Sequence, residues 1–167
     1  MQIELVSPET YSPLVDLLCE LHRYYHPGSS LLPETMRTHL LQHLLAADSP
    51  LRLVVAREED GRVVGLAAVS LVYSLVEAAP ATRRQCQLKE LYVRSSERGR
   101  GVGRQLMRWV AQYALANGCY RLDWPVNAAN RRGLRFYEGL GAQLVADRLS
   151  YRLSGERLQA CAEGTHS

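Results

Sequence analysis

A segment rich in glycine and arginine lies between an apolar run and a long amphipathic pattern, and it constrains the fold more than any other part of the chain. The segment is Arg98-Gly99-Arg100-Gly101-Val102-Gly103-Arg104, and it follows the strand-like run 88–93. Glycines let a backbone approach an anion closely, and the first turn of a helix offers unpaired N–H groups at the positive end of its dipole. Arginines add charge and forked donors. The sequence therefore predicts a phosphate cradle at a strand-to-helix junction.

A helix after this segment is predicted from apolar residues that recur at spacings of three and four. Asn117-Gly118 supplies the residues of a C-terminal cap. Two common nucleotide motifs do not fit, because Arg104-Gln105 stands where a Walker motif needs Lys-Ser/Thr, and Arg104 occupies the place of the last glycine of the dinucleotide fingerprint. The apolar stripe consists of Val102, Leu106, Trp109, Val110, Tyr113 and Ala114.

The spacing Arg98-x-x-Gly101-x-Gly103 resembles the acetyl-CoA pyrophosphate loop of the GNAT superfamily of N-acetyltransferases. Its flanks match as well, since a strand precedes it and Asn130 and the segment 134–142 follow it. Matching motifs cover residues 86 to 153. Within the superfamily, these motifs are most similar to the spermidine/spermine and related diamine acetyltransferases.

The order of elements agrees with this resemblance. The pattern predicts strands at 2–6, 51–56, 63–73, 86–93 and 120–126, helices at 8–25, 33–45 and 130–138 beside the long one, and a last strand or strands at Val145 and 148–153. The resemblance implies an α/β fold with a mixed, mostly antiparallel central sheet, splayed fourth and fifth strands and helices on both faces. We expect a single domain over 1–158 and a frayed tail over 159–167.

Composition suits a single soluble domain of 167 residues with a net charge of +3. The chain has no run of eighteen apolar residues and no basic-then-apolar leader, so we expect neither a membrane span nor a secretory signal. Four dispersed cysteines without CxxC pairs predict free thiols in a reducing compartment and no metal site. The expected location is the cytoplasm, and the resemblance implies a homodimer.

The resemblance also implies acetyl-CoA as co-substrate and direct attack of a neutral amine on its thioester. The amine must lose a proton, the carbonyl oxygen must be stabilised, and the leaving thiolate must be protonated. Backbone N–H groups of the splayed fourth strand are expected to stabilise the oxygen. The residues predicted to bind acetyl-CoA are Leu91, Tyr92, Val93, Arg98, Gly99, Arg100, Gly101, Val102, Gly103, Arg104, Asn130 and Tyr137.

Tyr137 is the expected general acid, because it aligns with the tyrosine of the family's Phe-Tyr segment. A phenol with an ordinary pKa of about 10 is protonated at neutral pH and ready to donate to sulfur. The alternative is that Phe136-Tyr137 is a packed aromatic pair, and we assign Phe136 to the core.

The acceptor amine is assigned to Glu90, which is expected to bind it or to accept its proton. Diamine acetyltransferases carry two consecutive acids at this point, and here Lys89, the only lysine among twenty basic residues, replaces the first. Lys89 argues against a highly cationic polyamine beside the strand and favours a substrate with a carboxylate, such as an amino acid. The alternative is that both residues are exposed charges on a strand edge.

Further acceptor contacts are expected from aromatic and acidic residues near the end of the first long helix and the start of the second, because aromatic rings beside carboxylates suit a cationic amine. The residues chosen are Tyr24, Tyr25 and Glu34. The alternative places Tyr25 in the core stripe of its helix and leaves the neighbouring histidines solvated.

The predicted function is acetyl transfer to a primary amine of a small molecule: a polyamine, a diamine or an amino-acid-like compound. Peptide, protein or aminoglycoside acceptors, and acetyl-CoA binding without catalysis, are the alternatives. An alternative function of a different kind is nucleic-acid binding, in which the arginines would contact phosphates. We expect no nucleic-acid partner, because the glycines stand at a strand-to-helix junction and the net charge is small.

Overall fold

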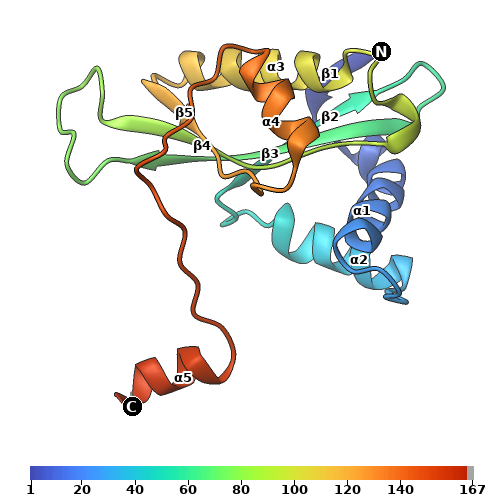
Figure 1. Ribbon diagram of the computed structural model, residues 1–167. Coiled ribbons are helices and arrows are strands. Elements are labelled where there is room, and N and C mark those ends of the chain that lie inside the picture. The colour runs from blue at the N-terminus through green and yellow to red at the C-terminus, as the bar shows by residue number, and fades with distance from the viewer. Residues whose placement is uncertain (165–167) are drawn as a thin grey trace. The chain divides into compact units, whose positions relative to one another are not determined.

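A five-stranded sheet forms the centre of the computed structural model, which describes residues 1–164 (Figure 1). The strands lie in the order β1-β2-β3-β4-β5, antiparallel except for the parallel pair β4–β5. Each of the first four strands pairs with its sequence neighbour, but only β2 and β3 are joined by a short turn, since helices lie between β1 and β2 and a ten-residue loop lies between β3 and β4. The strands are β1 (Gln2–Leu5), β2 (Leu51–Arg57), β3 (Val63–Tyr73), β4 (Arg84–Val93) and β5 (Arg121–Asp123).

Helices cover both faces of this sheet (Figure 1). On one face lie α1 (Tyr11–Tyr25), α2 (Pro33–His39) and the π-helical turn η2 (Leu40–Leu44). On the other lies α3 (Val102–Ala116). Two short 3-10 turns, η1 (Pro8–Thr10) and η3 (Ser95–Glu97), lead into α1 and follow β4. The mixed sheet with helices on both faces confirms the predicted fold class.

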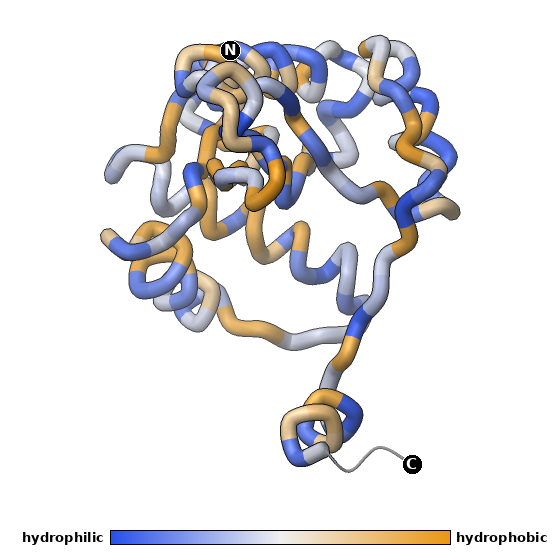
Figure 2. The backbone as a smooth tube through the Cα atoms, turned by 90° about the vertical axis from the view of Figure 1, so that its left-hand side faces the viewer, coloured by the Kyte–Doolittle hydropathy of each residue, from blue (hydrophilic) through white to orange (hydrophobic). Residues whose placement is uncertain are grey.

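The core on the α1 side follows from the two-residue period of the strands. Leu66 and Ala68 of β3 and Tyr92 of β4 point to this face and pack with Leu14 and Leu17 of α1, all of them buried. Figure 2 shows how hydrophobic and hydrophilic residues alternate along the backbone. The helices bury one side each, whereas the central strands β2 and β3 are buried on both faces.

The α3 side depends on a close approach at Gly65 of β3. A Cβ placed there would lie 3.0 Å from Leu106 Cδ1, 3.1 Å from Val102 Cγ1 and 3.2 Å from the Tyr92 carbonyl oxygen. Glycine therefore lets the first turns of α3 lie directly on the sheet. This contact fixes where the helix begins.

The sequence predicted most of these elements. The hairpin at Asp60-Gly61 is confirmed, with Gly61 at φ 87° and its N–H bonded to the Glu58 carbonyl at 3.0 Å. Gly118, at φ 70°, ends α3 as expected. β5 is shorter than the predicted 120–126, because its pairing with β4 covers three residues only.

Residues 126–164 belong to a second compact unit and are described by themselves. Helix α4 (Arg131–Glu138) is confirmed. The strands predicted at Val145 and 148–153 are wrong: these residues have the apolar alternation of a strand but no strand pairing within residues 1–164. A helix, α5 (Glu156–Glu163), occupies part of the expected tail, and 165–167 lie outside the described residues.

None of the helices within residues 1–164 is long and apolar enough to cross a membrane. All four cysteines are free thiols, as predicted: Cys19, Cys86 and Cys119 are buried and Cys161 is exposed. The single-domain organisation stays a prediction.

We predict that Gly65→Ala destabilises the protein by about 1–3 kcal/mol, because the new methyl group overpacks the contact between β3 and α3. Urea unfolding measures this change. The double variant Gly65→Ala/Leu106→Val, which removes the closest clashing group, should cost less than the sum of the two single changes. Strict additivity of the two would show that Leu106 does not limit the space at Gly65.

Candidate active site

Strand β4 loses its neighbour halfway along its length. Its pairing with β5 ends at Gln87 opposite Asp123, whereas β4 continues to Val93. A β-bulge follows at once on the other side, because Leu88 is opposite Val69 and Glu90 is opposite Ala68. Lys89 is therefore an extra residue without a partner in β3. Beyond this point β4 and β5 are no longer paired.

The opened edge presents backbone N–H groups. The Arg94 N–H donates to Val64 of β3 at 2.9 Å. Since successive residues of a strand direct their N–H groups to opposite edges, the Val93 and Leu91 N–H groups point to the side from which β5 has departed. The Leu91 N–H donates to Oε1 of Glu90 at 3.2 Å. Val93 therefore offers a donor at the open edge, and its role toward the carbonyl oxygen stays a prediction.

Glu90 lies on the α1 face of the sheet and is half-buried. The Tyr25 hydroxyl donates to its carboxylate, at 3.2 Å from Oε2. Burial raises the pKa of Glu90, although the hydrogen bonds from Tyr25 and from the Leu91 N–H act in the opposite direction. A carboxyl group with a raised pKa is a better proton acceptor when ionised, so this environment suits a general base.

The predicted cradle has the backbone that its glycines suggest. Gly99 has φ 84° and Gly101 has φ 85°, a region that favours glycine. A Cβ on either residue would meet no atom within 4 Å, so the space above the loop is open. Gly101 is the N-cap of α3, and the first intrahelical bond is Gln105 N–H to the Gly101 carbonyl at 3.1 Å. The first-turn N–H groups of this helix suit a pyrophosphate.

Several arginines near the cradle bind groups of the protein itself. Arg98 Nε donates to the Val93 carbonyl at 2.8 Å, and its guanidinium carbon lies 5.4 Å from the centre of the Tyr92 ring. Arg94 bonds Glu20 of α1 at 2.5 Å. These side chains hold the loop to β4 and α1. Because these arginine side chains already bind groups of the protein, the hypothesis that they contact nucleic acid is weakened.

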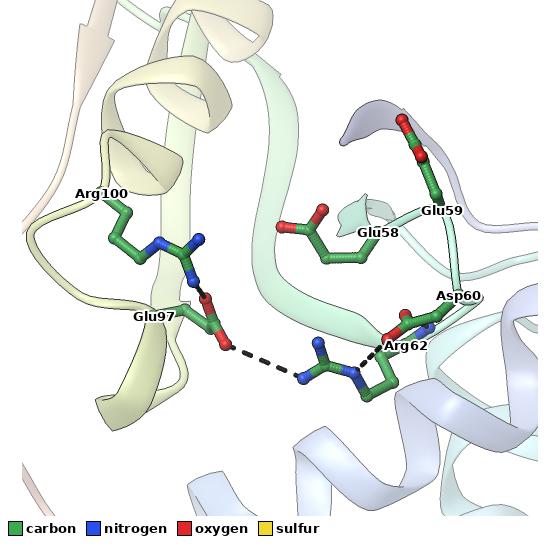
Figure 3. A pocket seen from close by; sticks show the side chains of 6 residues that line it. All are labelled: Glu58, Glu59, Asp60, Arg62, Glu97 and Arg100. Carbon is green, nitrogen blue, oxygen red and sulfur yellow. Dashed lines mark hydrogen bonds and ion pairs between the residues drawn. The ribbon is translucent and has the colours of Figure 1, made fainter.

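Arg100 is held by Glu97, a residue that the sequence did not single out. Glu97 is buried and binds Arg100 at 2.6 Å and Arg62 at 3.8 Å (Figure 3). Arg62 in turn bonds Asp60 at 2.6 Å. The sequence feature that could have identified Glu97 is an acidic residue directly before a basic loop, three residues from Arg100. Together with Glu58 and Glu59 these side chains line a hollow of about 430 Å³, and its four carboxylates make it unsuitable for a phosphate.

Of the predicted acceptor residues, the structure brings Tyr25 to Glu90, places Tyr24 beside Tyr25 and leaves Glu34 apart. The Tyr24 and Tyr25 rings meet edge to face at 5.2 Å, and both side chains are more than half exposed. The reading of Tyr25 as a core residue is therefore wrong. Glu34 is exposed in the first turn of α2, and within residues 1–164 it makes none of the contacts that hold this group together.

The sequence analysis did not identify the role of the Tyr92 side chain, which belongs to the same group. Tyr92 was predicted for its backbone only, yet its hydroxyl donates to Oε1 of Glu20 at 2.9 Å. Burial, together with the bond to Glu20 and its charge, raises the pKa of Tyr92 to about 12. Its phenol therefore stays protonated and fixes α1 to β4. The alternation of β4 does not reveal this bond, because it depends on packing between distant segments.

In the second unit, Asn130 is the N-cap of α4. Its Oδ1 accepts a hydrogen bond from the Gly133 N–H at 2.9 Å. A Cβ at Gly133 would lie 2.6 Å from Asn130 Nδ2, so a larger residue there would make the capping side chain shift. Phe136 and Tyr137 contact each other edge to face at 5.1 Å and are half-buried, so Phe136 is not the core residue we expected.

Comparisons with known proteins agree with this geometry. Residues 14–142 match the acetyltransferase (GNAT) family. The chain belongs to this family. The match confirms the resemblance found in the sequence and makes the protein a member of a family of acyltransferases.

Relatives with curated names include the thialysine N-ε-acetyltransferase of Mus musculus, 32% identical over 60% of this chain and 58% of that protein. The L-ornithine N5-acetyltransferase of Arabidopsis thaliana is 34% identical over 44% of this chain and 32% of that protein. The chain thus spans less than two thirds of either relative. A solved structure of an integron cassette protein from the mobile metagenome of V. cholerae is similar with a TM-score of 0.87, 30% identity and 97% of both chains covered.

We predict that Gly101→Val abolishes CoA binding in calorimetry, because a branched residue cannot hold φ 85° and the amides of the cradle must move. Gly118→Val is the matched control, since it imposes similar backbone strain at the opposite end of α3. The control should lose stability and retain CoA affinity. Normal CoA binding by the Gly101 variant would show that the cradle lies elsewhere.

The pH dependence of turnover provides a second prediction. Removing the Tyr25 hydroxyl with Tyr25→Phe deletes a bond that favours the ionised Glu90, so the pKa of Glu90 should rise further. The rising limb of the pH–rate profile should then move to higher pH. Tyr24→Phe is the control, and it should leave the limb in place. If both variants show the wild-type limb, Glu90 is not the group that titrates.

Proposed function

We propose that this protein transfers the acetyl group of acetyl-CoA to a primary amine of a small molecule, by direct attack within a ternary complex. The observation that carries the proposal is the opened edge of β4. There a half-buried carboxyl group with a raised pKa and an outward-pointing backbone N–H lie within a few residues of a glycine cradle at a helix N-terminus. Acetyl-CoA would supply the activated thioester.

The first step assigned to the chain is removal of the amine proton. Glu90 is suited to it because its pKa is raised, so the ionised form accepts a proton more readily than an ordinary glutamate. The transfer runs directly or through one water. The Tyr25 hydroxyl orients the carboxylate through its hydrogen bond.

The second step is stabilisation of the carbonyl oxygen as it gains charge. The Val93 N–H serves as the donor, since a preorganised amide requires no rearrangement during the reaction. The cradle of residues 99–103 would hold the pyrophosphate and thereby set the distance between the thioester and β4. Arg98 supports this geometry by joining the loop to the Val93 carbonyl.

The third step, protonation of the departing thiolate, is assigned to Tyr137 from the family motif. Asn130 supports it by capping the helix on which the tyrosine lies. We assign the acceptor to small amines because the curated relatives are named for acetyl transfer to thialysine and to ornithine. We also infer, from the resemblance alone, a homodimer located in the cytoplasm.

A screen of acetyl transfer to polyamines, diamines, amino acids, aminoglycosides and peptides tests this function. Tyr137→Phe should lower turnover by roughly ten- to ten-thousand-fold with little change in KM for acetyl-CoA, since the hydroxyl acts as general acid and matters more to turnover than to ground-state affinity. Glu90→Gln should raise KM for the amine or displace the rising limb of the pH–rate profile, and acetyl-CoA binding should be unchanged.

Two results would contradict the proposal at different points. Binding of acetyl-CoA without transfer to any amine in the screen would identify a non-catalytic acetyl-CoA-binding protein. Unchanged turnover of Tyr137→Phe would leave acetyl transfer intact and reduce this tyrosine to a packing residue.

A further inference from the structure

A hollow of about 580 Å³ adjoins the bulge of β4 on the face that α1 and α2 cover. It is lined by Gln42 and His43 of η2, by Asp48 and Ser49 of the following turn, and by Lys89 among others. The lining thus contains a cation and an anion from segments far apart in the sequence. No step of the proposed acetyl transfer uses this hollow.

The charge of Lys89 is available to a ligand. Its Nζ donates to the neutral Gln87 Oε1 at 2.8 Å. Within residues 1–164 no carboxylate lies within 4.0 Å of it. An ammonium group has three donors, so two remain for an anionic partner.

Asp48 provides the opposite charge across the same hollow. Its side chain is exposed, and within the described part of the chain it forms no ion pair with Lys89 or with any other cation. Two opposite charges that share a hollow without pairing suit a ligand that carries both an anionic and a cationic group. A zwitterionic amino-acid head has this pattern.

The bulge connects this hollow with Glu90. It places two successive residues, Lys89 and Glu90, on the same face of the sheet, and their Cα atoms are separated by only about 3.8 Å. A ligand whose head group contacts Lys89 therefore needs only a short alkyl chain to bring a second amine to the Glu90 carboxylate.

We propose, on the basis of the acetyl transfer proposed above, that the acceptor is a diamino acid whose zwitterionic head binds between Lys89 and Asp48 and whose side-chain amine is directed to Glu90. Lys89 binds the carboxylate and Asp48 the α-ammonium group. A simple diamine lacks the carboxylate and presents a second cation near Lys89, so the same site disfavours it.

Matched acceptors test this assignment. L-Ornithine and putrescine differ only by the carboxylate, and 5-aminopentanoate retains the carboxylate without the α-amine. The wild-type protein should acetylate ornithine with a higher kcat/KM than either analogue. Lys89→Met should reduce kcat/KM for ornithine by roughly ten- to a hundredfold, the range of one charge-assisted hydrogen bond, and should leave putrescine unchanged or improved.

The second charge has its own variant. Asp48→Asn should lower the use of ornithine and spare 5-aminopentanoate. Arg108→Met is the control for net charge, because it removes a cation from the exposed side of α3, and it should not change the ratio of ornithine to putrescine.

The outcomes separate this inference from the proposed function. Equal use of ornithine and putrescine by the wild-type protein, or equal losses for both in Lys89→Met, would overturn the zwitterion site and leave acetyl transfer standing. Absence of transfer to every amine, despite bound acetyl-CoA, would overturn both.

Discussion

The departure of β5 from β4 is the constraint on which the rest of the site depends. Hydrogen bonding between parallel strands ends at Gln87, and β4 alone continues to Val93. A strand that ran fully paired to its end would have no N–H groups available at this edge. The bulge at Lys89 accompanies the departure, since an extra residue bends a strand and increases its twist. The opening and the orientation of Glu90 therefore have one common cause.

An opened strand needs support from elsewhere, and α1 provides it. Glu20 accepts hydrogen bonds from both Tyr92 and Arg94, one on each side of the residue that offers its N–H. Arg98 then bonds the Val93 carbonyl and lies over the Tyr92 ring. Helix α1, strand β4 and the glycine loop are thus joined by charge-assisted bonds in a half-buried setting, where such bonds are strong. A substitution in α1 that breaks these bonds should therefore change the position of the cradle.

What the sequence predicted well was set by local rules. The glycines at 99 and 101, the hairpin at Gly61 and the cap at Gly118 all have positive φ, and a short pattern identifies such positions. The strand 63–73 was identified because β-branched and apolar residues persist over its length, and the strand 86–93 because apolar residues recur along a run that leads into the glycine loop. For the same reason the family could be named from its loop and flanks.

What it predicted poorly depends on partners. Polar and apolar residues alternate along 148–153 as they do in a strand. Alternation makes one face apolar, but it does not provide a neighbouring strand for pairing. The bulge at Lys89 was not foreseen either, because it is a property of the register between β3 and β4. Glu97 was not identified either, because it pairs with Arg62, which is distant along the chain. Each of these errors concerns a contact over a long sequence separation.

The division of labour at the site explains how one fold accommodates different acceptors. In the proposed mechanism the donor to the carbonyl oxygen is the main-chain N–H of Val93 and the cradle is built from main-chain amides, so neither uses a side-chain functional group. The proposed acceptor contacts, in contrast, come from side chains at the bulge and on α1, such as Lys89, Glu90 and Tyr25. Replacing an acidic residue by lysine at position 89 would therefore change the charge at the proposed acceptor site and leave the groups proposed to act on the thioester in place. In the proposed mechanism, specificity varies at the bulge, whereas the donor to the carbonyl oxygen and the pyrophosphate cradle are main-chain groups.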